Sequence, residues 1–340
     1  MPTNAPLISI CIANYNGMDI IDDCLRSVLE QQGNIAIEIL LHDDASTDGS
    51  ADHVSTKYPG VELIRSDSNV GFCIANNRMA AAATGQYVLL LNNDAALFPD
   101  ALQTLLAEAR QIDKPAILTL PQFDATSGAL VDRGCLLDPF FNPVPNLDPT
   151  RKDVAMVIGA CLWIPKTLWE ELEGFPEWFG SIAEDMYLCC RARLAGYAVR
   201  ALDTSGYRHW QGRSFGGGKV VDNQLSSTFR RRALSERNKT FVLVMTCPQP
   251  GFLLLMPIHV LLLFSEGLLI SILRRRMKFL SHIYLPACFA VLRNVAVLTT
   301  QRRKVMHIAK QDRRHFFAAF DFLPYKLRML LHHGLPKVVD

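Results

Sequence analysis

The sequence predicts an α/β protein with a mostly parallel, doubly wound sheet and helices on both faces, followed by a C-terminal hydrophobic and basic helical region. In the first 120 residues short apolar runs alternate with amphipathic stretches, which is typical of strand–helix–strand units in a parallel sheet. The apolar runs are nearly continuous, as expected for strands covered on both faces. Leucine-rich and basic segments follow residue 218.

The pattern predicts the elements in chain order. Strands are expected over residues 7–13, 37–43, 61–66, 86–92 and 115–121. Helices are expected between them: up to about Gln32, after Ser50, from about Gly71, and over 99–112. Segment 122–153 is rich in Pro, Asp, Asn and Gly and predicts a hairpin and a long loop. A strand over 154–165, helices near 166–173 and 183–195, and a strand over 197–202 follow.

Length and charge predict two domains, 1–218 and 219–340. At about 150 residues per domain, 340 residues suffice for two. With 49% hydrophobic and 20% charged residues, the chain is neither disordered nor a disulfide miniprotein. Residues 1–218 carry 15 Lys+Arg against 27 Asp+Glu (net −12), and residues 219–340 carry 20 against 6 (net +14).

Cysteines and the N-terminus predict a cytosolic first domain. The nine cysteines form no C-x-x-C pair, and two of them, Cys189 and Cys190, are adjacent, which favours a reducing compartment. The first 17 residues lack the basic and long apolar regions of a signal peptide, so we expect no export of the first domain.

Polar loops follow three of the predicted strands, at 14–17, 43–49 and 92–94. Ligands of open parallel sheets bind beyond the carboxyl ends of the strands. Asp, Asn and Ser also form turns and helix caps, as we expect of Ser46 and Asp48, so one such loop would mean little. Three at one edge predict a binding site.

Four motifs, ISICIANYNG, HDDASTDGS, SNVGFCIANN and YVLLLNNDA, resemble in order and spacing the nucleotide-sugar half of family 2 glycosyltransferases, which have the GT-A fold. The resemblance implies a nucleotide-sugar half, 1–120, and an acceptor half, 121–218. It implies that Tyr15 lies against the base and that Asp44 accepts the imide N–H of the base. The other donor-binding residues that it implies are Asn16, Asn69, Gly71, Asn77, Asn92, Asn93 and Arg213.

The resemblance places Asn92–Asp94 at the metal-binding D-x-D position. Only Asp94 is a carboxylate, so one ligand of Mg²⁺ or Mn²⁺ is expected there, while Asn92 would reach the ribose or a bound water. Such a cation stabilises the charge of a leaving nucleoside diphosphate. In related enzymes a His after the last core strand closes on the metal, which makes His209 a second candidate, although a lone His is as often structural. Glycines 216–218 form no P-loop, and we expect a flap there with Arg213 and Ser214 on the phosphates.

Glu184 and Asp185 open a predicted helix, whose N-terminal dipole favours ionised carboxylates. Without context they are ordinary first-turn acids. By resemblance the pair marks the acceptor side, with Asp185 deprotonating the acceptor hydroxyl beside Glu184, so that one displacement inverts the anomeric configuration. The acceptor-binding residues expected with them are Gly159, Ala160, Trp178 and Trp210, although a Trp near a strand is more often core.

The tail predicts membrane association. Residues 252–273 would span about 33 Å as a helix, enough to cross a bilayer. Basic clusters precede this run, separate it from a second one at 283–298, and follow the second. The positive-inside preference would keep all three in the cytosol, which neither one span nor a hairpin allows. We therefore expect helices lying in the inner leaflet with basic residues on anionic headgroups, and keep spanning as the alternative.

The segments LPACFAVLRN and QRRK are similar to the tail of bacterial rhamnosyltransferase-like members of the family, which act on lipid-linked glycans. The sequence thus predicts an inverting hexosyl- or deoxyhexosyltransferase. It would move a sugar from a nucleotide-diphosphate donor to a polyprenyl-diphosphate-linked glycan at the cytoplasmic face of the plasma membrane. Leucine runs of this length disfavour a nucleic-acid partner.

Two alternatives stay open. The depleted D-x-D motif allows a catalytically impaired scaffold that binds glycan or lipid. A sugar nucleotidyltransferase also couples a parallel sheet to metal and nucleotide. That class should carry a Gly-rich basic loop where this chain has Asn14, Tyr15 and Asn16, which disfavours it.

Overall fold

The computed structural model describes residues 5–210, 217–221, 224–310, 313–334 and 337–339. The chain packs as two units whose segments interleave along the sequence. One, the sheet unit, comprises residues 1–135, 145–181 and 197–210. The other, the helical unit, comprises residues 136–144, 182–196 and 211–340. The division predicted at residue 218 was linear, whereas the helical unit also takes residues 136–144, 182–196 and 211–218 of the predicted first domain.

A seven-stranded sheet with the order β12-β6-β11-β4-β1-β2-β3 forms the centre of the sheet unit. Its strands are β1 (Ile8–Asn14), β2 (Ile37–Asp43), β3 (Val61–Arg65), β4 (Tyr87–Asn92), β6 (Ala116–Thr119), β11 (Cys161–Pro165) and β12 (Ala198–Ala201). Neighbouring strands pair in parallel, except that β11 runs antiparallel to β4 and β6. The predicted mostly parallel sheet is confirmed.

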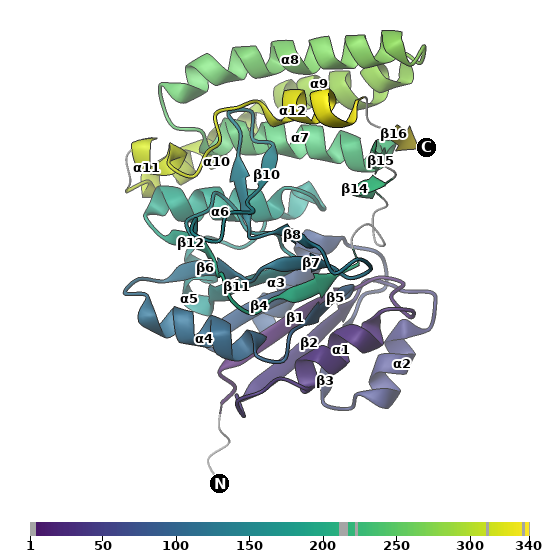
Figure 1. Ribbon diagram of the computed structural model, residues 1–340, viewed down its shortest axis with the longest axis vertical. Helices are drawn as coiled ribbons and strands as arrows, with labels where there is room; N and C mark the ends of the chain where they lie inside the picture. The colour runs from purple at the N-terminus through teal and green to yellow at the C-terminus, as the bar shows by residue number, and fades with distance from the viewer. Residues whose placement is uncertain (1–4, 211–216, 222–223, 311–312, 335–336, 340) are drawn as a thin grey trace. The chain divides into compact units, whose positions relative to one another are not determined.

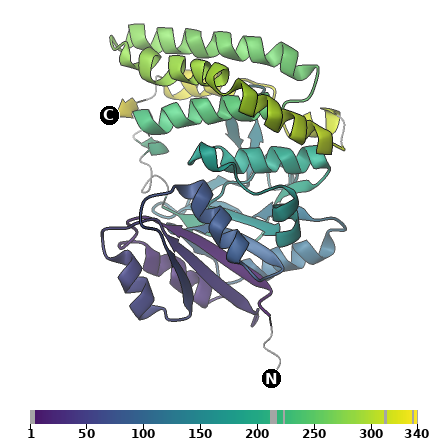
Figure 2. The ribbon, with the colours of Figure 1, turned by 180° about the vertical axis from the view of Figure 1, so that it is seen from behind.

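Helices cover both faces of this sheet, as predicted. Figure 1 shows α1 (Ile21–Leu29) and α4 (Ala101–Gln111) on one face, and Figure 2 shows α3 (Phe72–Ala82) on the other. Alternate residues of β1, such as Ile10, share one buried cluster with Leu25 of α1 and Leu105 of α4. The unit also contains α2 (Ser50–Lys57), α5 (Lys166–Glu171) and the 3-10 turn Glu177–Phe179.

A smaller sheet with the order β5-β13-β7-β8 carries part of the candidate site. Its strands are β5 (Ala95–Leu97), β7 (Gln122–Asp124), β8 (Leu130–Asp132) and β13 (Tyr207–His209). β7 and β8 pair antiparallel, which confirms the predicted hairpin. β13 lies between β5 and β7 and places His209 opposite Ala95, the residue after Asp94. A separate two-stranded sheet is formed by β9 (Cys135–Leu137) and β10 (Pro143–Pro145).

The strand predicted over 154–165 was wrong in its first half. Only Cys161–Pro165 is a strand, because the chain turns just before it, where the Cys161 N–H donates to the Ile158 carbonyl at 3.2 Å. Val154 and Val157 are fully buried in an irregular segment. The apolar composition thus predicted burial correctly but not strand pairing.

The helical unit contains α6 (Glu184–Ala195) and the C-terminal helices. They are α7 (Phe229–Thr246), α8 (Gly251–Leu273), a π-helical turn (Leu280–Tyr284), α9 (Leu285–Arg293), α10 (Val295–Ile308), α11 (Arg313–Phe317) and α12 (Tyr325–His333). A small sheet joins β14 (Gly217–Val221), β15 (Gln224–Thr228) and β16 (Lys337–Val339). The predicted tail is therefore helical, and its second apolar run bends by 71° where α9 ends and α10 begins.

A buried group of charges ties α7 to α8 and α12. Glu236 of α7, 2% exposed, lies 2.5 Å from the ammonium of Lys239 and 2.6 Å from that of Lys326 on α12. Glu266 of α8 pairs with Arg232 at 2.7 Å and with Lys326 at 2.6 Å. Burial opposes ionisation of Glu236, but the cations of Lys239, Lys326 and Arg232 outweigh it and hold its pKa well below the ordinary value.

We predict that Glu236→Gln destabilises the protein by about 3–5 kcal/mol, because it leaves buried cations without their counter-charge. The measurement is the free energy of unfolding from urea denaturation followed by circular dichroism. Glu62→Gln, at an exposed position on β3, is the control and should change it little. Equal effects of the two substitutions would contradict a structural role of the ion pairs.

Candidate functional site

The polar loops after β1, β2 and β4 meet at one edge of the central sheet, as predicted. Asn14, the last residue of β1 and 1% exposed, joins them. Its Nδ2 donates to Asp43 Oδ1 at 3.1 Å and to Ser50 Oγ at 2.9 Å. Its Oδ1 accepts a hydrogen bond from Asn93 Nδ2 at 2.9 Å. One buried amide thus links all three loops.

Gly17 lies so close to the side chains of Asn14 and Asn93 that a side chain at this position would clash with them. A Cβ at this position would lie 2.2 Å from Asn14 Oδ1 and 2.5 Å from Asn93 Nδ2. Neither Asn14 nor Gly17 had a predicted role of its own. The feature of the sequence that could have indicated the role of Asn14 is an amide side chain at the last position of an otherwise apolar strand.

In the loop after β1, one predicted donor-binding residue, Tyr15, is exposed, and the other, Asn16, is hydrogen-bonded to the loop after β2. The Tyr15 side chain is 50% exposed, so its ring is available for stacking. Asn16 has a left-handed backbone, with φ of 49°, and its Oδ1 accepts the Thr47 N–H at 2.8 Å. The Asn16 N–H donates to Ser46 Oγ at 2.9 Å. The donor-binding roles of both residues stay predictions.

The carboxylate of Asp44 organises the turn that leads into α3. Its Oδ1 accepts the Val70 N–H at 2.6 Å, and its Oδ2 accepts the Gly71 N–H at 2.9 Å. Asn69 Nδ2 donates to the Asp44 carbonyl at 3.4 Å. Each carboxylate oxygen has a second acceptor position, so Asp44 can still accept an N–H from a base. Gly71 has φ of 90°, a conformation that favours glycine.

Asn77 bonds to the main chain of Phe175 in both directions. Its Nδ2 donates to the Phe175 carbonyl at 2.9 Å, and its Oδ1 accepts the Phe175 N–H at 3.0 Å. These bonds secure the segment that carries Trp178, which is 37% exposed and packs edge-on against Phe179. The observed contacts of Asn77 are structural, and its predicted contact with the donor is untested.

Asp94 and His209, the two predicted metal ligands, contact each other. His209 Nε2 lies 3.0 Å from Asp94 Oδ1, and the two residues are 8% and 2% exposed. The pairing of β13 with β5 brings them together, and the Trp210 N–H donates to the Asp94 carbonyl at 2.9 Å. Asn92 Nδ2 lies 3.5 Å from the same His209 nitrogen.

Asp94 and His209 supply one oxygen and one nitrogen ligand for a cation. Within the described ranges, no group of three or more His, Cys, Asp or Glu side chains could hold a metal ion. Carboxylates suit Mg²⁺ and Mn²⁺, and an imidazole is a better ligand for a transition metal than for Mg²⁺. The donor set therefore fits Mn²⁺, provided that substrate phosphates complete the coordination shell.

The remaining predicted residues of the sheet unit lie close to β4 and β11. The carbonyl of Ala160, which is 1% exposed, accepts the Asn92 N–H at 3.1 Å, and Gly159 directly precedes it. Trp163 is fully buried and stacks on Tyr87 with ring centroids 4.7 Å apart, so it is core. The predicted phosphate contacts Arg213 and Ser214 lie outside the described residues.

Glu184 and Asp185 belong to the helical unit, in the first turn of α6, and are 5% and 9% exposed. The Met186 N–H donates to Asp185 Oδ1 at 2.7 Å. In the described part of the chain, the buried Oε2 of Glu184 has no hydrogen-bond partner. Burial and the charge of Asp185 raise the pKa of Glu184 to about 8, against the opposing charge of Arg231.

The helix dipole favours the ionised form of both acids, but it acts against other effects at Glu184. Burial and the neighbouring carboxylate outweigh the dipole at this position. Glu184 therefore binds its proton more tightly than an exposed glutamate does.

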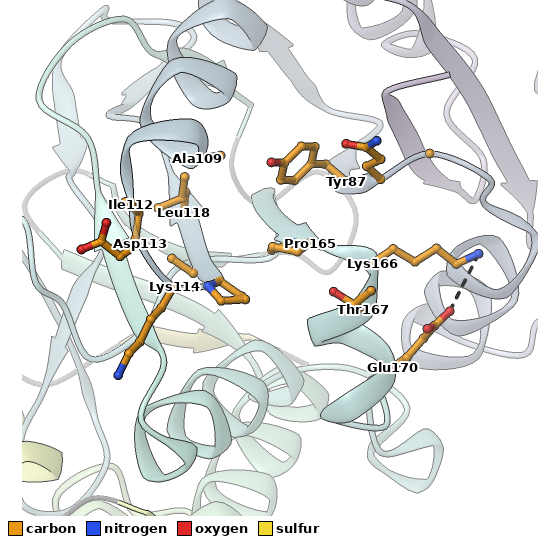
Figure 3. A pocket seen from close by; sticks show the side chains of 14 residues that line it. Tyr87, Ala109, Ile112, Asp113, Lys114, Leu118, Pro165, Lys166, Thr167 and Glu170 are labelled. Atoms are coloured by element: carbon orange, nitrogen blue, oxygen red, sulfur yellow. Dashed lines mark ion pairs between the residues drawn. The ribbon is translucent and has the colours of Figure 1, made fainter. Parts of the chain in front are cut away.

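A hollow of about 550 Å³ lies at the opposite edge of the sheet (Figure 3). Tyr87 at the start of β4, Ala116 at the start of β6 and Pro165 at the end of β11 help to line it. The ammonium of Lys166 donates to the Ala83 carbonyl and lies 3.8 Å from Glu170. We place the candidate site at the polar loops, where Asp44, Asp94 and His209 lie.

Sequence comparison decides the family. The pattern of "Glycosyl transferase family 2" matches residues 9–159, and that of "Glycosyl transferase family group 2" matches residues 87–332, well over half of the chain. The protein belongs to glycosyltransferase family 2. The resemblance of the four motifs is thereby confirmed.

A named relative agrees with this assignment, and two solved structures share the fold. An N-acetylglucosaminyl-diphospho-decaprenol L-rhamnosyltransferase of Mycobacterium tuberculosis is 25% identical over 211 residues, 53% of this chain and 68% of the relative. The structure of S. aureus TarS 1-349 with UDP superposes with a TM-score of 0.52 at 15% identity, covering 94% of this chain and 91% of that one. GalNAc-T7 with UDP, GalNAc and Mn²⁺ gives 0.58 at 15% identity, covering 87% and 58%. These likenesses to solved structures support the GT-A-like fold.

Other curated relatives match a shorter part of the chain. They are 32–38% identical over 105–113 residues. The chain spans 30–41% of the length of these relatives.

We predict that Glu184→Gln stabilises the protein increasingly as pH rises. The folded-state pKa of Glu184, about 8, exceeds the ordinary value of 4.5, so the folded state binds this proton more tightly than the unfolded state. Wild-type stability should therefore fall between about pH 4.5 and 8, whereas glutamine does not titrate. We expect the Tm of the variant to exceed that of the wild type by a few degrees at pH 8, since 1 kcal/mol shifts Tm by about 2–4 °C.

The measurement is Tm by circular dichroism between pH 4.5 and 9, with Glu30→Gln at an exposed position as control. A Tm difference that does not change across this range would contradict a raised pKa of Glu184.

Proposed function

We propose that this protein is an inverting glycosyltransferase that transfers one sugar from a nucleoside-diphosphate donor to a polyprenyl-diphosphate-linked glycan at the cytoplasmic face of the plasma membrane. The observation that carries the proposal is the 3.0 Å contact between Asp94 and His209, at the sheet edge that also presents Tyr15 and Asp44. Membership of family 2 supports sugar transfer as the reaction.

The donor is assigned to the polar loops of the sheet unit. The exposed ring of Tyr15 suits stacking on a nucleobase, and the Asp44 carboxylate suits a base N–H. A divalent cation held by Asp94 and His209 would neutralise charge on the departing diphosphate. The UDP bound in two solved structures of this fold, one of them with Mn²⁺, makes a UDP-sugar with Mn²⁺ the first donor to test.

Removal of the proton from the acceptor hydroxyl is assigned to Asp185. In this step Asp185 takes the proton of the acceptor hydroxyl, while the oxygen of that hydroxyl forms a bond to the anomeric carbon. The bond from that carbon to the diphosphate oxygen breaks on the opposite face, so the configuration inverts. Burial and the neighbouring Asp185 carboxylate raise the pKa of Glu184, which disfavours Glu184 as a second base. The decaprenol-diphosphate named for a relative supports a lipid-linked acceptor.

Membrane association is assigned to α8. Its 23 residues are long and apolar enough to cross a membrane. One stripe of α8, including His259, Leu263 and Gly267, is buried, whereas Leu253 and Leu261 are 66% and 64% exposed.

The packing of α8 favours a helix that lies along the bilayer surface. Glu266, in the C-terminal half of the helix, pairs with Arg232 and Lys326, so insertion across hydrocarbon would separate or bury these charges. We propose that the outer face of α8 enters the headgroup boundary while Arg274–Arg276 contact anionic lipid.

We predict that Asp185→Asn lowers kcat at least 100-fold while donor binding is retained, because the variant loses only the proton acceptor. Transfer of a radiolabelled sugar is measured with and without EDTA, which should abolish it. Donor binding is measured as thermal stabilisation, expected at about 2.7 kcal/mol when the donor is at 100 times its Kd. Asp113→Asn, at an exposed position of the sheet unit, is the control. Absence of transfer by the wild type with every nucleotide sugar would favour the scaffold alternative and overturn the proposal.

We predict that the protein sediments with vesicles that contain anionic lipid and much less with neutral vesicles. Replacing Arg274–Arg276 by serine should weaken binding about 100-fold, since each basic residue near the surface contributes about 1 kcal/mol. Arg110→Ser with Lys114→Ser in the sheet unit is the control. Equal binding to neutral vesicles would contradict the electrostatic contact. Resistance of the membrane-bound protein to alkaline extraction would favour spanning instead.

A further inference from the structure

The turn before α6 has an unfavourable backbone conformation. Ile182 and Ala183 have φ of 74° and 69°, and they are the only consecutive non-glycine residues with positive φ in the described part of the chain. Isoleucine is β-branched, which makes it one of the side chains least compatible with this conformation. Such a backbone persists only where its surroundings hold it.

This turn sets the direction of the two acids. Ala183 is the N-cap of α6, and its carbonyl accepts the Tyr187 N–H at 3.0 Å, so the helix begins with Glu184 and Asp185. A change of φ at residues 182 and 183 would rotate the first turn and redirect both carboxyl groups. Their orientation therefore depends on a conformation that the local sequence does not favour.

Asn238 of α7 holds the centre of the turn. Its side chain is fully buried, and its Nδ2 donates to the Ile182 carbonyl at 2.8 Å. Its Oδ1 accepts a hydrogen bond from Arg237 Nε at 2.8 Å. Only a side chain with both a donor and an acceptor can make these two bonds, and an amide does so without a charge.

We propose that Asn238 is a positioning residue for sugar transfer. By binding the Ile182 carbonyl it keeps residues 182 and 183 left-handed, and thereby keeps Asp185 oriented for proton abstraction. The inference rests on the proposed function, in which Asp185 is the base. Pre-organised geometry of this kind matters because a displacement of about 1 Å at a reacting group can cost 100-fold in rate.

The first test separates kcat from donor binding. Asn238→Ala should lower kcat about 100-fold. The KM for the nucleotide sugar and the stabilisation by nucleotide should stay at wild-type values, because the proposed contacts to the base and the metal lie in the sheet unit. Asn238→Asp keeps the shape but cannot donate, so it should show the same loss and serves as a second variant if the alanine variant does not fold.

Rescue by glycine is the decisive test. Glycine adopts positive φ without strain, so adding Ile182→Gly or Ala183→Gly to Asn238→Ala should recover at least 10-fold of the lost kcat. A residue that only stabilised packing would not be replaced by glycine in another element. No recovery with either glycine would overturn the positioning role.

Asn142→Ala is the matched control. Asn142 is a buried asparagine of the same unit, 7% exposed, whose amide donates to Asp138 Oδ2 at 2.8 Å and accepts from Lys239 Nζ at 2.7 Å. It should lower Tm by a similar amount with kcat changed less than 3-fold. Equal kcat losses in the Asn142 and Asn238 variants would overturn the inference.

Two further outcomes separate this inference from the proposed function. If the wild type transfers sugar and Asp185→Asn does not, but Asn238→Ala has wild-type kcat, only the positioning role fails. If the wild type transfers no sugar, the proposed function fails, and the crystal structure of Asn238→Ala tests the turn itself. Positive φ retained at both Ile182 and Ala183 in that structure would overturn the role of Asn238.

Discussion

The candidate donor site depends on the buried amide of Asn14. At 1% exposure, each polar atom of this side chain needs a partner inside the protein, and the partners are Asp43 at the end of β2 and Asn93 after β4. Parallel register places Asn14 opposite Asp43, and Ala13 opposite Asn92. The same strand pairing that builds the core therefore sets the positions of the loops that carry Tyr15, Asp44 and Asp94.

Two buried glutamates of the helical unit show how surroundings decide the chemistry of one residue type. Glu236 and Glu184 are 2% and 5% exposed. Glu236 has cations 2.5–3.5 Å away and remains ionised. Glu184 lies beside another carboxylate, and its pKa is raised. The ion pairs of Glu236 join helices of the unit. The proposed base is Asp185, the neighbour of Glu184.

Local pattern was enough to predict most of the sheet unit. The strand predicted at 37–43 coincides with β2, because a continuous apolar run between turn residues is a local property. The convergence of polar loops followed from topology alone, since carboxyl ends of parallel strands share an edge. The contact between Asp94 and His209 was reached through family resemblance, because no local pattern links residues 115 positions apart.

What the sequence could not reveal depends on packing between distant segments. α7 carries Glu236, Asn238 and Lys239 in its buried part, so it lacks the apolar periodicity by which a core helix is recognised. The junction at Asn14 and the left-handed turn at Ile182 are visible only once their partners are placed. The raised pKa of Glu184 likewise follows from its burial, which the sequence of the segment alone does not indicate.

The interleaving of the two units has a consequence for biogenesis. Every residue of α6 is buried, and within its own unit the helix packs against α7, α10 and α11, which are translated later. While the ribosome is still making those helices, α6 is tethered between finished strands with its packing surface uncovered. The packing surface of α6 can therefore be buried within its unit only after the tail has been synthesised. A chain shortened to residue 218 would keep that surface permanently unpaired, so the tail is part of the folding unit rather than an appendage.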